Sequence, residues 1–146
     1  MAYEGTEVPI SRSQEQIRKM IYEHKGTGVM TISQPPMEGF EALVTLQSKP
    51  YHIRVLAHCR EKDSRGYKIQ NKGIEQEQRR VWRVLHWHLK AMFEAADSGV
   101  LAIEEIIMPY VVTHDGRTIA EHILPKLHEA VVSNPRFLLP TGEKTK

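Results

Sequence analysis

The stretch from Gly73 to Gly99 reads GIEQEQRRVWRVLHWHLKAMFEAADSG, contains both tryptophans of the chain and decides the fold. Its apolar residues recur at intervals of three and four, which is the spacing of one face of an α-helix. Gly99 is typical of the residue at which a helix ends. We therefore expect a long amphipathic helix whose apolar face is covered by the rest of the chain. That face comprises Ile74, Val81, Trp82, Leu85, Leu89, Met92, Phe93 and Ala96.

The opposite face of this helix is charged, with Trp87 at its centre. Three cations surround the ring: Arg80, Arg83 and Lys90. Cations that contact phosphates, together with an aromatic ring that stacks on bases, are typical of proteins that bind single-stranded nucleic acid. The alternative is a solvated face whose tryptophan packs on the tail of the chain or on a second subunit, and Glu94 on the same face favours it.

Residues 59–72, CREKDSRGYKIQNK, precede the helix and carry more positive than negative side chains. Tyr67 lies among the charges. We expect a flexible basic loop that extends the binding surface of the helix. Its cations are Arg60, Lys62, Arg65, Lys68 and Lys72.

Three earlier segments predict a small antiparallel sheet. Residues 29–33 form a short strand that two prolines end, and residues 40–47 and 51–58 each alternate between apolar and polar side chains. A short turn at 48–50 would join the last two strands into a hairpin. One face of the sheet is apolar and must be covered, whereas the other is polar and includes Arg54, a further candidate for anion binding.

Helices are predicted on both sides of these elements. Ser13 and Gln16 fit a capping box that opens an N-terminal helix. Residues 101–112 are apolar nearly all round and predict a short buried helix that Pro109 ends or bends. Thr118 and Glu121 fit a second capping box. It opens a last helix that Pro125 bends, with these side chains pointing inward: Ile119, Ile123, Leu127, Ala130 and Val131.

The order of elements predicts an α+β fold: an N-terminal helix, a small three-stranded antiparallel sheet, a long central amphipathic helix and two further C-terminal helices. We expect a flexible arm at residues 1–12, one domain at 13–132 and a tail at 133–146. Because the edges of so small a sheet are not obviously protected, we also expect a homo-oligomer.

Composition excludes several classes of protein. The chain has 146 residues, of which 40% are hydrophobic and 26% charged, and a formal net charge of +2, which permits an anionic partner without requiring one. A single cysteine, Cys59, excludes an intrachain disulfide and a cysteine-rich zinc site. The chain has neither an apolar run of about 18–20 residues nor the apolar region of a signal peptide. We expect a cytoplasmic protein without membrane contact.

Catalytic and metal-binding patterns are weak. His86 and His88 point about 200° apart on a helix, so they cannot hold one metal ion together. Cys59 could be activated by His58 or Arg60, but strand neighbours point to opposite faces, so we interpret the thiol as inert. Neither a phosphate-binding loop nor a nucleophile elbow is present. We predict no cofactor, no metal and no catalytic residue.

The second half resembles a family of small uncharacterised proteins from bacteriophages and mobile elements. The resemblance covers residues 79–127, about a third of the chain, and the histidines and tryptophan at 86–88 depart from its pattern. It implies a phage origin and no particular activity. The matching residues are Trp82, Arg83, Lys90, Glu94, Gly99, Glu104, Asp115, Gly116, Arg117, Thr118, Glu121 and Pro125.

Within that segment, Asp115, Gly116 and Thr118 have structural roles in the turn at 115–118. Arg117 has none, so it could bind a carboxylate of the preceding acidic helix or an anion.

Taken together, the basic and aromatic surface and the resemblance predict a non-catalytic phage accessory protein that binds single-stranded nucleic acid with little sequence preference. The alternative is a counter-defence protein that sequesters a nucleotide signal or blocks a host protein as a homo-oligomer. It would use the same arginines, or Arg54 and Arg117, around a pocket between subunits. A metal-dependent hydrolase is a third possibility, and metal in the purified protein would be its sign.

Overall fold

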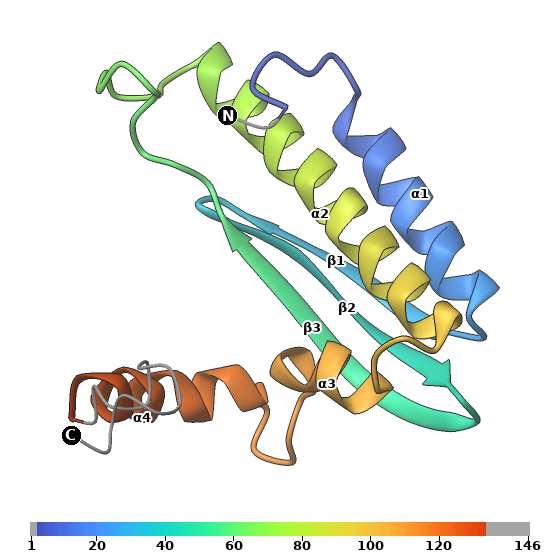
Figure 1. The fold of residues 1–146 in the computed structure, drawn as a ribbon. Helices are drawn as coiled ribbons and strands as arrows, with labels where there is room; N and C mark the ends of the chain where they lie inside the picture. Colours follow the sequence, from blue (N-terminus) through green and yellow to red (C-terminus); the bar gives the residue numbers. More distant parts are fainter. Residues whose placement is uncertain (1–2, 134–146) are drawn as a thin grey trace.

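The computed structural model describes residues 3–133 and has the α+β fold that the sequence predicts (Figure 1). An N-terminal helix precedes a three-stranded antiparallel sheet, and the long central helix and the C-terminal helices follow. The elements are α1 (Ile10–Glu23), β1 (Thr27–Gln34), β2 (Met37–Leu46), β3 (Lys49–His58), α2 (Lys72–Ser98), α3 (Ile103–Ile107), the 3-10 helix η1 (Met108–Tyr110) and α4 (Ile119–Ser133).

The three strands are longer than the sequence predicts. The turn between β2 and β3 also lies one residue or more earlier than the predicted turn at 48–50. β2 and β3 are joined by Gln47 and Ser48, which both adopt positive φ (48° and 67°). Two such residues form the tight turn whose twist matches that of the strands. Pro50 therefore belongs to β3, where it pairs with Thr45, and not to the turn. The strand order is β1-β2-β3.

Helices α1 and α2 lie side by side on one face of this sheet (Figure 1). At one end Gln76 Nε2 donates a hydrogen bond to Thr6 O (2.8 Å), and at the other His24 Nε2 lies 3.0 Å from Asp97 Oδ2, so the two helices run in the same direction. The apolar face predicted for α2 is buried except for Ile74. The core includes Ile17, Ile21, Phe40, Ala42, Val44, Ile53, Val55, Trp82, Leu85, Leu89 and Phe93.

The first helix does not begin where the capping box predicts. Helix α1 starts at Ile10, and the carbonyl of Pro9 accepts the first backbone hydrogen bonds, from Arg12 and Ser13. Ser13 is fully buried on the helix and caps nothing. Proline is tolerated at position 9, just before the helix, because the first N–H groups of a helix have no partner inside it and the missing N–H of proline therefore costs no hydrogen bond.

The chain after α2 continues along the free edge of β3. Val112 N donates to His52 O (2.8 Å), and Val111 forms a bridge with Ile53. Pro109 lies in η1, where helix α3 gives way to a tighter turn, as predicted. This segment places α3 and η1 beside the end of α2, and His88 Nε2 lies 2.8 Å from Tyr110 Oη.

Helix α4 contradicts the predicted inward face. Thr118 caps it as expected, because Glu121 N donates to Thr118 Oγ1 (3.3 Å), and Pro125 lies inside it. However, Ile123 and Leu127 are about half exposed. Figure 1 shows α4 extending away from the sheet and from α2, so neither the sheet nor α2 covers these side chains. Ala130, Val131 and the predicted tail lie outside the described side chains.

None of the helices within residues 3–133 is both long enough and apolar enough to cross a bilayer.

Candidate functional site

Arg83 is not on the exposed face of α2 that the sequence predicts. Arg83 is only 7% exposed. Its Nη2 donates a hydrogen bond to His86 Nδ1 on the side of α2 that faces α1. Arginine only donates hydrogen bonds, so this imidazole has to be neutral at Nδ1. Burial, then the charges of Arg83 and Lys90, lower the pKa of His86 to about 4, which agrees with a neutral ring.

Arg80 and Arg60 converge on one buried carboxylate. Glu77 is 3% exposed, and its oxygens lie 2.7 Å from Arg80 Nε and 3.1 Å from Arg60 Nη2. The backbone N–H of Arg60 also donates to it (2.7 Å). Burial alone would raise the pKa of Glu77, but the hydrogen bonds from Arg80 and Arg60 outweigh burial and lower it to about 2. Both arginines therefore have a structural role at the start of α2.

Arg54 and Arg117 both contact other residues of the chain. Arg54 Nε lies 2.6 Å from Glu41 Oε1 on the polar sheet face, and its Nη1 donates to Gly116 O (2.8 Å). Arg54 thus ties the turn before α4 to the sheet. Arg117 Nε lies 3.9 Å from Oε2 of Glu121, a residue of α4. The carboxylate partner of Arg117 is therefore not in the preceding acidic helix that the sequence suggested.

Trp87 and Lys90 remain at the surface of α2. Trp87 is 42% exposed, and Lys90 Nζ lies 4.7 Å from the centre of its ring. The guanidinium carbon of Arg83 lies 5.8 Å from the same ring. These cation–π contacts occupy part of the indole surface that a base would need for stacking.

The predicted flexible loop is an ordered hairpin, which we call the basic hairpin (residues 61–69). Lys62 and Lys68 are bridge partners across it, and Ile69 N donates to Glu61 O (2.8 Å). Its tip is a turn built by Asp63, whose Oδ1 accepts hydrogen bonds from two backbone N–H groups, 2.9 and 3.0 Å away. Gly66 adopts a φ of 87°, which favours glycine.

The basic hairpin presents cations around an exposed aromatic ring. Tyr67 is 67% exposed, and the guanidinium carbon of Arg65 lies 5.5 Å from its ring centre. Lys62 and Lys68 are exposed, and neither forms an ion pair with any residue in the range 3–133. The hairpin therefore brings together three of the predicted cations. Tyr67 was missed as a site residue, although an aromatic residue within a basic run is a visible signal.

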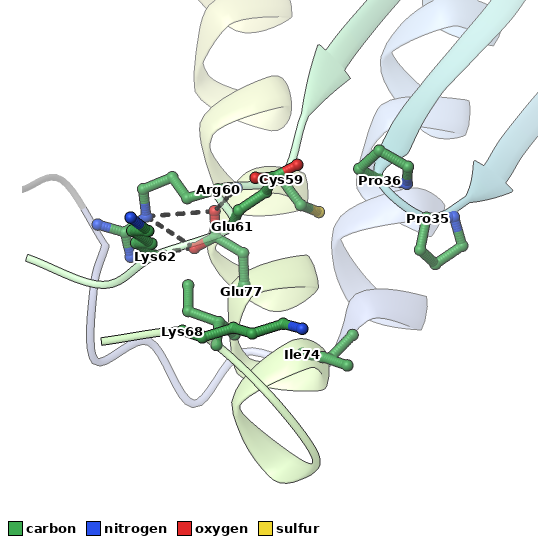
Figure 2. A pocket seen from close by; sticks show the side chains of 10 residues that line it. Pro35, Pro36, Cys59, Arg60, Glu61, Lys62, Lys68, Ile74 and Glu77 are labelled. Atoms are coloured by element: carbon green, nitrogen blue, oxygen red, sulfur yellow. Dashed lines mark hydrogen bonds and ion pairs between the residues drawn. The ribbon is translucent and has the colours of Figure 1, made fainter. Parts of the chain in front are cut away.

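A pocket of about 480 Å³ lies between the basic hairpin, the start of α2 and the turn between β1 and β2 (Figure 2). Figure 2 shows the two prolines of that turn across the pocket from the Arg60–Glu77 ion pair. The lining residues are Pro35, Pro36, Cys59, Arg60, Glu61, Lys62, Lys68, Ile69, Ile74 and Glu77.

Cys59 in this pocket is a poor nucleophile. Burial, followed by the negative charges of Glu38 and Glu77, raises the pKa of its thiol to about 11. Only the thiolate attacks, so this environment opposes the activation that neighbouring basic residues could have given. Among residues 3–133, no group of three or more histidine, cysteine or acidic side chains is arranged to hold a metal ion.

No family model, curated protein or solved structure shows significant similarity to this chain. The resemblance to phage proteins therefore stays a prediction of the sequence. What the protein does has to be inferred from the arrangement of its own side chains.

Proposed function

We propose that the protein is a non-catalytic accessory protein that binds single-stranded nucleic acid with little sequence preference through the basic hairpin. The observation that carries the proposal is the exposed ring of Tyr67 with Arg65 beside it. Lys62 and Lys68 lie on the flanking strands, and their ammonium groups form no ion pair within residues 3–133. Cations that track phosphates and a ring that stacks on a base are the two elements of such binding.

The basic hairpin replaces the face of α2 as the main contact surface. Arg83 is buried, and Arg80 is held by Glu77, so neither guanidinium is available without breaking an internal contact. Trp87 is exposed and Lys90 is half-buried beside it, and the two residues provide a secondary surface. No base-reading pattern is visible on the hairpin, and contacts to phosphates and ring faces are tolerant of sequence.

Tyr67→Ala is expected to weaken binding of a single-stranded oligonucleotide by roughly 5- to 150-fold, because loss of one base–aromatic stack costs about 1–3 kcal/mol. Fluorescence anisotropy of a labelled oligonucleotide measures the change. Tyr22→Ala is the matched control, since Tyr22 is an exposed tyrosine of α1 (54%). Equal affinity of the two variants would contradict the proposal.

The melting temperature of the wild-type protein, measured with different ligands, distinguishes strand binding from the alternative, sequestration of a nucleotide. A ligand that binds the folded state raises the melting temperature. A rise with a cyclic dinucleotide but none with oligonucleotides would favour sequestration, whereas the proposal predicts a rise with oligonucleotides.

A further inference from the structure

The pocket beside the basic hairpin has the size and the walls of a site for a flat, partly apolar ligand. Its volume of about 480 Å³ falls in the range of about 300–1,000 Å³ that is typical of small-molecule sites. Pro35 and Pro36 form one wall, and Ile69 and Ile74 contribute apolar surface to the lining. The side chain of Ile74 is 44% exposed, so part of its surface is open to an occupant.

The charges around the pocket favour an anionic group on that ligand. Lys62 and Lys68 belong to the lining and form no ion pair with the described residues 3–133. Glu77 also lines the pocket, but Arg60 and Arg80 neutralise its carboxylate. Glu61 is the other carboxylate of the lining. With Arg60, the lining holds three cations and these two carboxylates, and Arg60 also forms an ion pair with Glu4 (3.1 Å).

The pocket and the proposed strand-binding surface share two residues. Lys62 and Lys68 are bridge partners in the basic hairpin and also line the pocket. A strand whose phosphates contact these lysines would therefore pass along the pocket rim. An unstacked base exposes flat apolar faces, which the prolines and isoleucines can contact in place of neighbouring bases.

We propose that this pocket takes one unstacked nucleotide of a bound single strand. The base lies between the turn prolines and the side chains of Ile69 and Ile74, and the phosphate lies at Lys62 and Lys68. This inference rests on the proposed function, because it needs a strand on the basic hairpin.

The test uses the full chain and an oligonucleotide with a single 2-aminopurine, whose fluorescence increases when the base unstacks. Ile74→Trp fills the pocket from an exposed position at the start of α2. Ile123→Trp is the matched control, because Ile123 on α4 is 46% exposed and distant in sequence from the pocket lining. Far-ultraviolet circular dichroism and melting confirm that each variant is folded. Lys68→Met, also at an exposed position, is the second pocket variant.

With the wild-type protein and Ile123→Trp we expect an increase in 2-aminopurine fluorescence on binding. With Ile74→Trp we expect that increase to disappear and affinity to fall at least about fivefold, equivalent to loss of one base contact. If the wild-type protein binds the oligonucleotide and both pocket variants keep the wild-type fluorescence increase, the pocket inference alone is overturned. If the wild-type protein does not bind the oligonucleotide, the proposed function fails and the inference fails with it.

Discussion

Glu77→Ala is expected to lower the free energy of unfolding by about 3–5 kcal/mol, because removal of one partner leaves buried charges without compensation. Glu77 is the common acceptor for Arg80 and for the side chain and backbone N–H of Arg60. The side chain of Arg80 is only 12% exposed, so water cannot replace the carboxylate fully. The basic hairpin follows Arg60 directly, and we expect its attachment to α2 to loosen in the same variant.

The pH dependence of stability gives an independent readout of Glu77. Its pKa is about 2 in the folded protein and has an ordinary value of 4.5. A carboxyl group with a lowered pKa stabilises the folded state above its ordinary pKa, and this contribution is lost as the pH falls towards the folded pKa. The contribution of about 3 kcal/mol is therefore present above pH 4.5 and disappears between about pH 4.5 and 2.

Glu77→Gln is the matched control, since it keeps the shape of the side chain and removes only the charge. Urea unfolding of the wild-type protein and of this variant, from pH 7 to pH 2.5, measures the difference in stability. We expect the difference to shrink as the pH falls below 4.5, because protonation gives the wild-type side chain the same neutral state. A difference that does not change with pH would mean that the charge of Glu77 contributes nothing.

Trp82→Ala is expected to lower the free energy of unfolding by about 3–5 kcal/mol, as is typical when a buried tryptophan is truncated. Trp82 is fully buried beneath α2, and its Nε1 donates a hydrogen bond to Glu38 Oε1 (3.0 Å). Glu38 is itself fully buried, and Ser33 and Gln78 are its other hydrogen-bond donors. The indole thus fills the core and also satisfies part of a buried carboxylate.

Two further variants separate these roles. Trp82→Phe keeps most of the apolar volume and removes the donor to Glu38, so we expect a smaller loss of about 1–3 kcal/mol. Trp87→Ala, one and a half turns later on the same helix, truncates a half-exposed tryptophan and should cost less than about 1 kcal/mol. Chemical denaturation measures all three. Equal losses at the two tryptophans would contradict the assignment of Trp82 to the core.

The sheet and the core face of α2 could be predicted from sequence because burial follows periodicity. Residues 40–46 and 51–57 alternate with a period of two, and one set of alternate residues is buried against the helices: Phe40, Ala42, Val44, Leu46, Ile53 and Val55. The central helix was predicted within one or two residues at each end. Periodicity is informative here because α1 and α2 cover one face of the sheet, so alternate residues of each strand are buried.

The polar contacts of α2 could not be predicted in the same way. A helical wheel gives the direction of a side chain and not what packs beside it. Arg83 is buried because α1 lies alongside α2, and Glu77 is buried because Arg60 folds back onto it from the end of β3. Both contacts join segments distant in sequence. The sequence therefore indicated the cations and could not show which of them are used internally.

Exposure also differs from the prediction at apolar positions of α2 and α4. The sequence predicts that Ile74 on α2 and both Ile123 and Leu127 on α4 face inward, yet all three are about half exposed. An apolar stripe shows that a helix needs a partner surface, but it does not show that the surface lies in the same chain. Self-association consequently stays a prediction of the sequence.

The salt dependence of oligonucleotide affinity shows whether the lysines of the basic hairpin contact the phosphates of a bound strand. For single strands, the logarithm of the binding constant falls with the logarithm of salt concentration with a slope of about −0.7 for each phosphate neutralised. Oligonucleotide affinity is measured between about 50 and 200 mM salt for the wild-type protein and for the double variant Lys62→Ala, Lys68→Ala. The control is Lys19→Ala, Lys126→Ala, which removes the same charge from exposed positions on α1 and α4.

If the basic hairpin holds the strand, the Lys62, Lys68 variant has a slope shallower than the wild type by about 1.4, and the Lys19, Lys126 control keeps the wild-type slope. An unchanged slope in the hairpin variant, or an equal change in the control, would show that the basic hairpin does not hold the strand.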